Sequence, residues 1–543
     1  MSPESPLESS SEATPAVNVR SPNAQSPNAQ SPNASDLTSR RARFFDVALL
    51  TAIYGIVLWF GQRRALWYDE LFTWHIASLP RVLGVWNALR DGVDLNPPLS
   101  YLLVRASQSV FGDGNFGTRL PFMLALIAAS WCLYAFMSRR TSRVVAFFTA
   151  LLPLASKAFL YGFEARPYAL LLLCGAASML CWQRAIDEAS STRCRKIARC
   201  GLALSLAIAV SSHYFGVFLL WPLLIGEVVR YFFTRRIDRN LLIALLIGIA
   251  PLILFWPLLR GARQYANGFW AQPELVTDTM RFYDQLAEML WLIAWVLGVL
   301  WIVIWWIQRT KPQFKATSVV FLPHEWAAVV ALATLPLVCV VAARLAGSSY
   351  VFRYAVAGVI GVILLVGLTA GALEKRSSWT RGLYAAMCAV CVLLMQISTA
   401  PWRTEDATGG HRVLDVLSPS ILRLLPPGMP IVVSEPQRFL QLYHYAAPSL
   451  RRRLVYLSDV SLSLRYLKDD TGDRALTKLS RCVNIPVHDY HRFLQENRRF
   501  VLLDDAAGKA WIAPHLRASK TRFKTVVQRG NIRLSRIELD SAF

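Results

Sequence analysis

The sequence predicts a mainly α-helical, polytopic membrane protein with about eleven transmembrane helices, outer-face interfacial helices and a small C-terminal α/β soluble domain. Hydrophobic residues make up 54% of the 543 residues, and the mean hydropathy of +0.36 is too apolar for a soluble chain of this length. Only 17% of the residues are charged, yet the formal net charge is +23. Most Lys and Arg residues lie in short clusters between apolar segments, which favours a membrane protein over a nucleic-acid-binding protein.

Residues 1–38 are predicted to form a disordered cytoplasmic tail. They are rich in Ser, Pro, Asn and Ala, and the run Ser-Pro-Asn-Ala-Gln occurs at 21–25 and again at 26–30. This composition buries too little apolar surface to fold. It also lacks the apolar core that follows the basic start of a signal peptide. Arg40 and Arg41 precede the first apolar run and should hold the N-terminus in the cytoplasm.

A transmembrane domain is expected over residues 39–400. With the N-terminus inside, the expected cytoplasmic loops, such as 138–143, 184–199 and 234–239, are all rich in Lys or Arg. This alternation of basic loops predicts a multi-pass protein of the cytoplasmic (inner) membrane. An odd number of spans places its C-terminus outside. The eleven expected spans are 44–61, 119–137, 144–160, 167–183, 200–213, 214–232, 240–258, 287–307, 325–343, 354–373 and 381–399.

Two further regions are predicted outside the membrane. Residues 67–112 include an apolar run after Pro97 and Pro98, but a crossing there would invert every later loop, so we expect interfacial helices on the outer face. Residues 401–543 alternate short apolar runs, such as 430–434, with helix-like stretches. That alternation predicts an extracytoplasmic α/β domain with a partly parallel sheet.

Two adjacent carboxylates, Asp69 and Glu70, follow the first predicted span by only a few residues. Carboxylates beside a bilayer are costly and are often kept for chemistry or ion binding. One of them can serve as a general base while the other orients it or binds a cation. The alternative is a helix cap, because acidic residues commonly begin helices.

A second polar group follows the third predicted span, where Glu164 and Arg166 flank a single residue. They can form a local ion pair of little consequence. Alternatively, Glu164 joins the acidic pair and Arg166 binds a phosphate. Asn96 stands before a rigid Pro-Pro turn and either orients substrate or caps that turn.

Two other cations are predicted on the outer side, Lys157 and Arg353. A planar guanidinium suits a phosphate ester leaving group, although Arg353 can also snorkel to the interface. His213 lies at a tight turn between two predicted spans, where it contacts substrate or serves the turn. Residues 401–543 contain no phosphate loop, dinucleotide fingerprint or zinc spacing.

The ordered motifs resemble those of the C-type membrane glycosyltransferases. The motifs are Tyr-Asp-Glu at 68–70, Asn-Pro-Pro-Leu-Ser-Tyr-Leu-Leu at 96–103, Arg-Leu-Pro at 119–121 and Glu-Ala-Arg-Pro-Tyr at 164–168. The branch they resemble is that of the protein O-mannosyltransferases and the lipid A aminoarabinose transferase. The resemblance covers about residues 44–400.

The resemblance implies transfer of a sugar from a polyprenyl-phosphate carrier to an acceptor outside the cytoplasmic membrane, with inversion of the anomeric centre. It implies that Asp69 activates the acceptor with Glu70 and Glu164 nearby, and that Arg353 and Tyr354 lie where the family binds the carrier phosphate. The chain departs from the family at Asn96, where the family often has His. Candidate catalytic residues are Asp69, Glu70 and Glu164, and candidate substrate-binding residues are Asn96, Arg166, Tyr168, Lys157, His213, Arg353 and Tyr354.

The expected partners are the lipid-linked sugar donor, a glycan, lipid or protein acceptor, and membrane lipids, with no nucleic acid. No metal ligands are assigned, although a divalent cation held by Asp69 and Glu164 is compatible with the sequence. The main rival is a transporter or flippase of a lipid-linked saccharide, which would favour ionisable residues near the bilayer midplane and internal repeats. A non-catalytic assembly protein is a second rival.

Overall fold

The fold is described from a computed structural model. It describes residues 34–539, except 266–267, 270, 311–321, 401–416, 506–509 and 520. Most of the predicted tail lies outside these residues. The chain divides into two compact units, residues 1–46 and 47–543. All packing described below belongs to the second unit.

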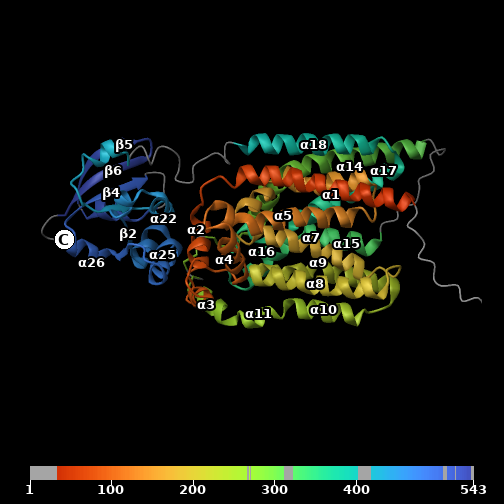
Figure 1. The fold of residues 1–543 in the computed structure, drawn as a ribbon, viewed down its shortest axis with the longest axis horizontal. Helices are drawn as coiled ribbons and strands as arrows, with labels where there is room; N and C mark the ends of the chain where they lie inside the picture. Colours follow the sequence, from red (N-terminus) through yellow and green to blue (C-terminus); the bar gives the residue numbers. More distant parts are fainter. Residues whose placement is uncertain are drawn as a thin grey trace, which may run out of the picture. The chain divides into compact units, whose positions relative to one another are not determined.

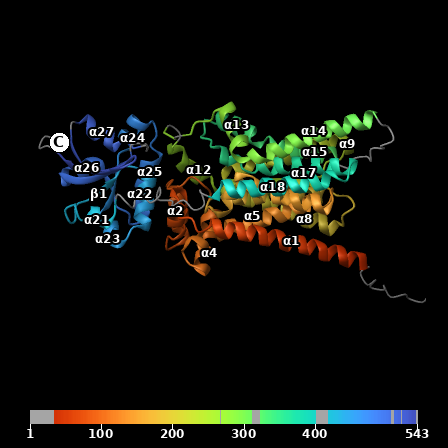
Figure 2. The ribbon, with the colours of Figure 1, turned by 90° about the horizontal axis from the view of Figure 1, so that it is seen from above.

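Long apolar helices run beside one another in the helical part of this unit (Figure 1, Figure 2). Within the described residues, seven helices are long and apolar enough to cross a membrane, or up to ten if three bent pairs each count as one. The predicted span 200–213 is present as α8, but α8 is not among these ten, so the count of eleven stays a prediction. The long helices are α1 (Ala34–Gly61), α5 (Asn115–Met137), α7 (Tyr168–Ala185), α8 (Thr192–Ser212), α9 (Leu220–Thr234), α14 (Glu288–Thr310), α17 (Gly358–Arg376) and α18 (Thr380–Ser398).

Three spans predicted as single helices are broken, so their prediction as continuous helices was wrong. The bends are 76°, 56° and 54°. Pro153, Pro257 and Pro336 lie within three residues of the breaks. Proline removes a helical hydrogen bond and clashes with the preceding turn. The broken elements are α6 (Arg143–Leu151), η1 (Leu152–Ala155) and η2 (Lys157–Phe163); α10 (Arg239–Ile249), α11 (Pro251–Leu254), α12 (Trp256–Ala262) and η4 (Arg263–Tyr265); and α15 (Pro323–Ala333) and α16 (Leu335–Leu345).

Residues 67–112 form three short helices that pack on one another, α2 (Tyr68–Ala77), α3 (Val82–Arg90) and α4 (Leu99–Phe111). Pro98 stands immediately before α4, where a missing N–H costs nothing. The predicted helices are therefore present, whereas their place at the outer interface stays a prediction. Three more short elements complete the helical part, namely η3 (Tyr214–Leu219), α13 (Leu275–Leu286) and η5 (Phe352–Ala355).

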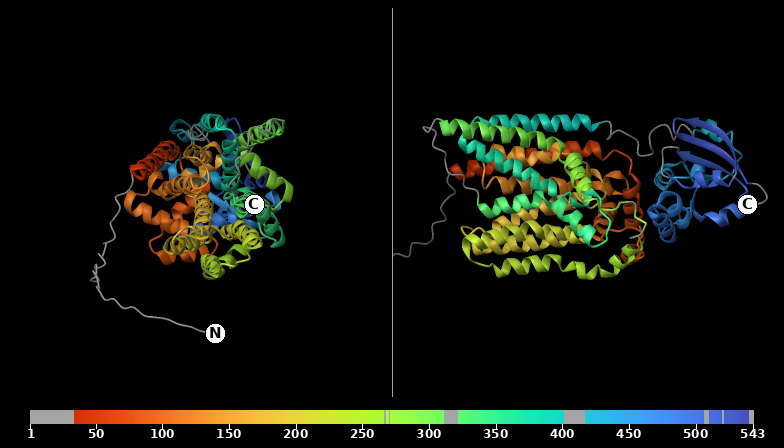
Figure 3. Two further views of the ribbon diagram at one scale, coloured as in Figure 1. Left: turned by 90° about the vertical axis from the view of Figure 1, so that its right-hand side faces the viewer. Right: turned by 180° about the vertical axis from the view of Figure 1, so that it is seen from behind.

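The C-terminal part contains one six-stranded sheet in the order β3-β2-β1-β4-β6-β5 (Figure 3). The neighbouring pairs among β1 to β4 are parallel, and β6 pairs antiparallel with both β4 and β5. The predicted partly parallel sheet is thus confirmed. Its strands are β1 (Ile431–Val433), β2 (Leu454–Ser458), β3 (Val487–Asp489), β4 (Arg499–Asp505), β5 (Arg522–Arg529) and β6 (Ile532–Glu538). Its helices are α21 (Pro419–Leu422), α22 (Pro436–Tyr445), α23 (Pro448–Arg451), α24 (Val460–Leu467), α25 (Thr471–Cys482), α26 (Tyr490–Glu496) and α27 (Ile512–Ala518).

Candidate active site

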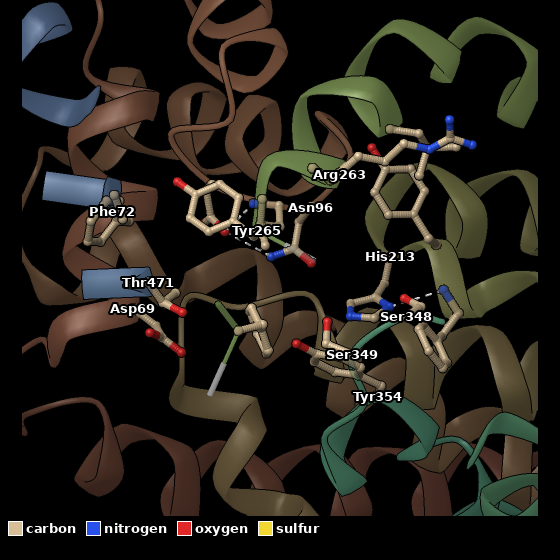
Figure 4. A pocket seen from close by; sticks show the side chains of 18 of the residues that line it. Asp69, Phe72, Asn96, His213, Arg263, Tyr265, Ser348, Ser349, Tyr354 and Thr471 are labelled. Carbon is tan, nitrogen blue, oxygen red and sulfur yellow. Dashed lines mark hydrogen bonds between the residues drawn. The ribbon is translucent and has the colours of Figure 1, made fainter. Parts of the chain in front are cut away.

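A cavity of about 400 Å³ lies where α2, the loop before α4, the start of α7 and the turn before η3 meet. Segments α12–η4, 346–354 and α25 complete its wall (Figure 4). Seven of the ten predicted site residues line this cavity, although they come from segments far apart in the sequence. These seven are Asp69, Asn96, Arg166, Tyr168, His213, Arg353 and Tyr354.

Asp69 and Arg353 form an ion pair on the cavity wall. Arg353 Nη2 donates to Asp69 Oδ2 at 3.1 Å, and the two side chains are 22% and 20% exposed. The guanidinium carbon of Arg353 also lies 5.6 Å from the ring centres of both Trp67 and Tyr168. Aromatic faces attract a cation, so Arg353 is fixed beside the carboxylate while both remain open to a ligand.

Arg166 makes a second ion pair, with Asp94. Its Nη1 also lies within hydrogen-bond distance of the carbonyl of Asp69, at 3.3 Å. Asp94 lines the cavity and contacts the amide of Asn96, whose Nδ2 lies 3.4 Å from Asp94 Oδ1. The local ion pair between Glu164 and Arg166, one of the two alternatives from the sequence, is absent from the described contacts, since Arg166 pairs with Asp94 instead.

Both arginines keep one donor unused. The Nε atoms of Arg353 and Arg166 are buried and have no hydrogen-bond partner among the described residues. A buried donor without a partner costs about 1–3 kcal/mol. A bound anion that accepted these N–H groups would recover that energy, so the arginines suit an anionic ligand.

Aromatic and imidazole rings form another part of the wall. The rings of His213 and Tyr354 lie 4.7 Å apart between centroids, and His213 Nδ1 accepts from the backbone N–H of Phe215 at 3.2 Å. His213 therefore begins η3 and lines the cavity as well, so the structural and ligand-binding readings are compatible.

Glu70 is fully buried and does not line the cavity. It forms a two-point ion pair with Arg119, with distances of 2.7 Å from Nε to Oε1 and 2.6 Å from Nη2 to Oε2. Its carboxylate also accepts from the backbone N–H groups of Ala165 (2.8 Å) and Trp67 (3.2 Å). Arg119 in turn donates to the carbonyls of Gln62, Arg64 and Ala65. We call this group the Glu70–Arg119 cluster; it ties together the end of α1, α2, α5 and the loop before α7.

Glu164 and Lys157 also lie off the cavity wall. Glu164 is buried, and burial together with the neighbouring Glu70 raises its carboxyl pKa to about 7. Lys157 pairs with Glu288 at 3.0 Å, and these two side chains are 41% and 46% exposed. The sequence analysis predicts that Lys157 binds substrate. In the structure its ammonium group pairs with the half-exposed carboxylate of Glu288, outside the cavity.

Several lining residues were not among the candidates. Asp94 stands two residues before the candidate Asn96, so the sequence could have identified it as a candidate as well. Arg263 is an exposed cation at the outer end of a predicted span, where the positive-inside rule expects few cations, and it makes no ion pair among the described residues. No sequence signal marks Tyr265 or Thr471.

The described residues contain no group of three or more His, Cys, Asp or Glu side chains placed to hold a metal ion. Of the two proposed cation ligands, Asp69 lines the cavity and Glu164 does not. Asp69 Oδ2 is held by Arg353. The arrangement of the described side chains therefore fits an anion contacted by arginines better than a resident cation.

Comparisons with known proteins bear on the family and the fold of the chain. Residues 95–260 match the family described as dolichyl-phosphate-mannose-protein mannosyltransferase, and no curated protein sequence matches the chain. The fold is similar to that of ArnT from Cupriavidus metallidurans bound to undecaprenyl phosphate, with a TM-score of 0.53, 13% identity and coverage of 90% of this chain and 97% of that chain. Weaker similarity extends to the oligosaccharyltransferase of Archaeoglobus fulgidus, with a TM-score of 0.44, 9% identity and coverage of 84% and 69%.

The family match and the shared fold confirm the resemblance to the C-type membrane glycosyltransferases on the branch of the O-mannosyltransferases and ArnT. The chain therefore has the fold of a multi-pass membrane glycosyltransferase.

Proposed function

We propose that this protein transfers a sugar from a polyprenyl-phosphate carrier to an acceptor at the outer face of the cytoplasmic membrane, with inversion. One observation carries the proposal: Asp69 and Arg353 are paired on the wall of a cavity that combines ionised and aromatic side chains. The family match and the similarity to the ArnT structure bound to undecaprenyl phosphate support a lipid-phosphate donor.

Asp69 is the proposed base. Its carboxylate accepts the proton of the acceptor hydroxyl or amine as that group attacks the anomeric carbon. The bond from this carbon to the carrier phosphate breaks in the same displacement, so the configuration inverts. The arginine that holds Asp69 fixes its direction, and fixed geometry is a large part of such catalysis.

Arg353 and Arg166 are proposed to stabilise the leaving phosphate. Negative charge grows on the carrier phosphate as the glycosidic bond breaks, and preorganised cations lower the energy of that transition state. Their buried Nε–H groups lack partners among the described residues and can donate to phosphate oxygens. Tyr168, Tyr354, His213 and Asn96 then line the space for the sugar ring.

The test is transfer of label from a panel of radiolabelled polyprenyl-phosphate sugars by the purified protein. Release of sugar from one donor, with product of inverted configuration, is the expected result and identifies the donor. Tight binding of undecaprenyl phosphate without release from any donor would replace the proposal with the transporter or flippase.

A further inference from the structure

The C-terminal sheet and the short helices α2 and α3 share one hydrophobic core. Leu71, Phe72 and Leu89 from the short helices belong to the same buried cluster as Ile431 from β1 and Phe439 from α22. The backbone N–H of Leu66 also donates to the hydroxyl of Tyr445 at 2.6 Å. A domain attached only by a linker would close its own core. This one completes its core with the helix that carries Asp69.

Helix α25 makes the contacts nearest the cavity. The N–H of Asp470, just before α25, donates to the carbonyl of Gly268 at 3.1 Å. Lys478 Nζ donates to Gln264 Oε1 at 2.9 Å and lies 4.6 Å from the ring centre of Tyr265. A Cβ on Gly268 would lie 2.6 Å from Asp470 Oδ1, so a larger residue there would require the Asp470 side chain to shift. Helix α25 and the residue before it are therefore closely fitted against Gln264, Tyr265 and Gly268.

Tyr265 extends the connection to the cavity. It is buried, lines the cavity, and donates its hydroxyl hydrogen to the carbonyl of Gly92 at 2.7 Å. Thr471 and Ala475, on the first turns of α25, line the same cavity. Figure 4 shows Thr471 among the labelled side chains around it, together with Asp69 and Tyr265. The C-terminal part thus supplies cavity wall directly and through Tyr265.

We propose that α25 forms the acceptor side of the active site and that Thr471 is a specificity-determining residue. This inference rests on the proposed function. A polyprenyl tail needs apolar surface in the bilayer, which the spanning helices supply. Helix α25 does not belong to those apolar helices, and its first residue, Thr471, lines the cavity with a polar side chain suited to the partner that carries no polyprenyl tail. The geometry assigns that partner as the acceptor.

The test compares Thr471→Trp with wild type in two measurements on the full-length protein. The first is transfer of radiolabel from a polyprenyl-phosphate sugar to the acceptors in isolated membranes. The second is binding of undecaprenyl phosphate. The larger ring should lower transfer about tenfold or more because it displaces the acceptor, and should leave undecaprenyl phosphate binding within about twofold. Thr525→Trp, at an exposed strand position off the cavity, is the matched control and should match wild type in both.

Each outcome has one meaning. Unchanged transfer by Thr471→Trp, with active wild type, overturns the inference and leaves the proposed function standing. Loss of undecaprenyl phosphate binding by a well-folded Thr471→Trp places Thr471 on the donor side and also overturns it. If Thr471→Trp fails to fold, Thr471→Val replaces it, and a changed acceptor KM with unchanged undecaprenyl phosphate binding is then required. No transfer by wild type refutes the proposed function itself.

Discussion

The cavity wall and the Glu70–Arg119 cluster both use the start of α2 and the loop before α7, yet they have different properties. Asp69 and Arg166 line the cavity, whereas Glu70 and Glu164 point into the protein. In the cavity, the Asp69–Arg353 pair is partly exposed, and the Nε donors of Arg353 and Arg166 have no partner among the described residues. In the cluster, every oxygen of Glu70 is engaged. The cavity wall thus keeps polar groups open to a ligand, whereas Glu70 and Arg119 are paired with each other and with backbone groups.

The largest expected effect is a loss of transfer on substitution of Asp69, which would distinguish its role from that of the neighbouring Glu70. Asp69→Asn keeps the size of the side chain but removes the proton acceptor, so transfer should fall by about 10²–10⁴-fold. Binding of undecaprenyl phosphate and the melting temperature should stay close to wild type. The measurement is radiolabel transfer by purified protein, with the exposed Asp113→Asn as control. Retained transfer would remove Asp69 from the mechanism.

Glu70→Ala should act on stability instead. It leaves the buried guanidinium of Arg119 without its counterion, which typically costs about 3–5 kcal/mol. Thermal unfolding in detergent should show a lowered melting temperature, while Glu496→Ala, at an exposed position, should not. A Glu70→Ala protein with wild-type stability and no transfer would contradict the structural role and make Glu70 a catalytic residue.

His75, also on α2, allows the same comparison to be tested through the pH dependence of stability. Burial, and then the neighbouring His444, lowers the pKa of His75 to about 4. The folded protein thus favours the neutral ring, and this contribution to stability, about 3 kcal/mol at most, is present above about pH 6.5 and is lost as pH falls toward 4. Burial raises the pKa of Asp473 to about 6, so that group loses its contribution as pH rises through 6.

The variant His75→Phe isolates the first of these effects. Between pH 7 and 4, its melting temperature should fall less than that of wild type, because the phenyl ring cannot be protonated. His488→Phe, at an exposed strand position, should follow the wild-type curve. Parallel curves for wild type and His75→Phe would show that His75 does not titrate in this range.

The smallest effect is expected at Lys157. Its ion pair with Glu288 is half-exposed, and such pairs contribute about 0–1 kcal/mol. Lys157→Met should therefore keep transfer within about twofold of wild type, as should the exposed control Lys524→Met. A tenfold loss in Lys157→Met alone would restore Lys157 as a substrate-binding residue and enlarge the site beyond the cavity.

Much of the architecture follows from local sequence. Runs of apolar residues predict the long helices, and short apolar runs around 431, 454 and 500 predict strands of the sheet. Local sequence patterns were insufficient where contacts between helices determine whether a helix is straight or bent. Three predicted straight spans bend near prolines, because the sequence shows the lost hydrogen bond but not whether surrounding helices permit a bend.

The sequence by itself determined that two carboxylates, several arginines and a set of ordered motifs would belong to one membrane protein with an α/β C-terminal part. Only the tertiary structure decided which of them share a cavity. Apart from the family resemblance, no local pattern distinguishes Asp69 from Glu70, but they are adjacent in a helix and therefore face different neighbours. Thr471 and Tyr265 carry no motif at all. Their place beside Asp69 depends on packing between segments hundreds of residues apart, which local sequence patterns do not encode.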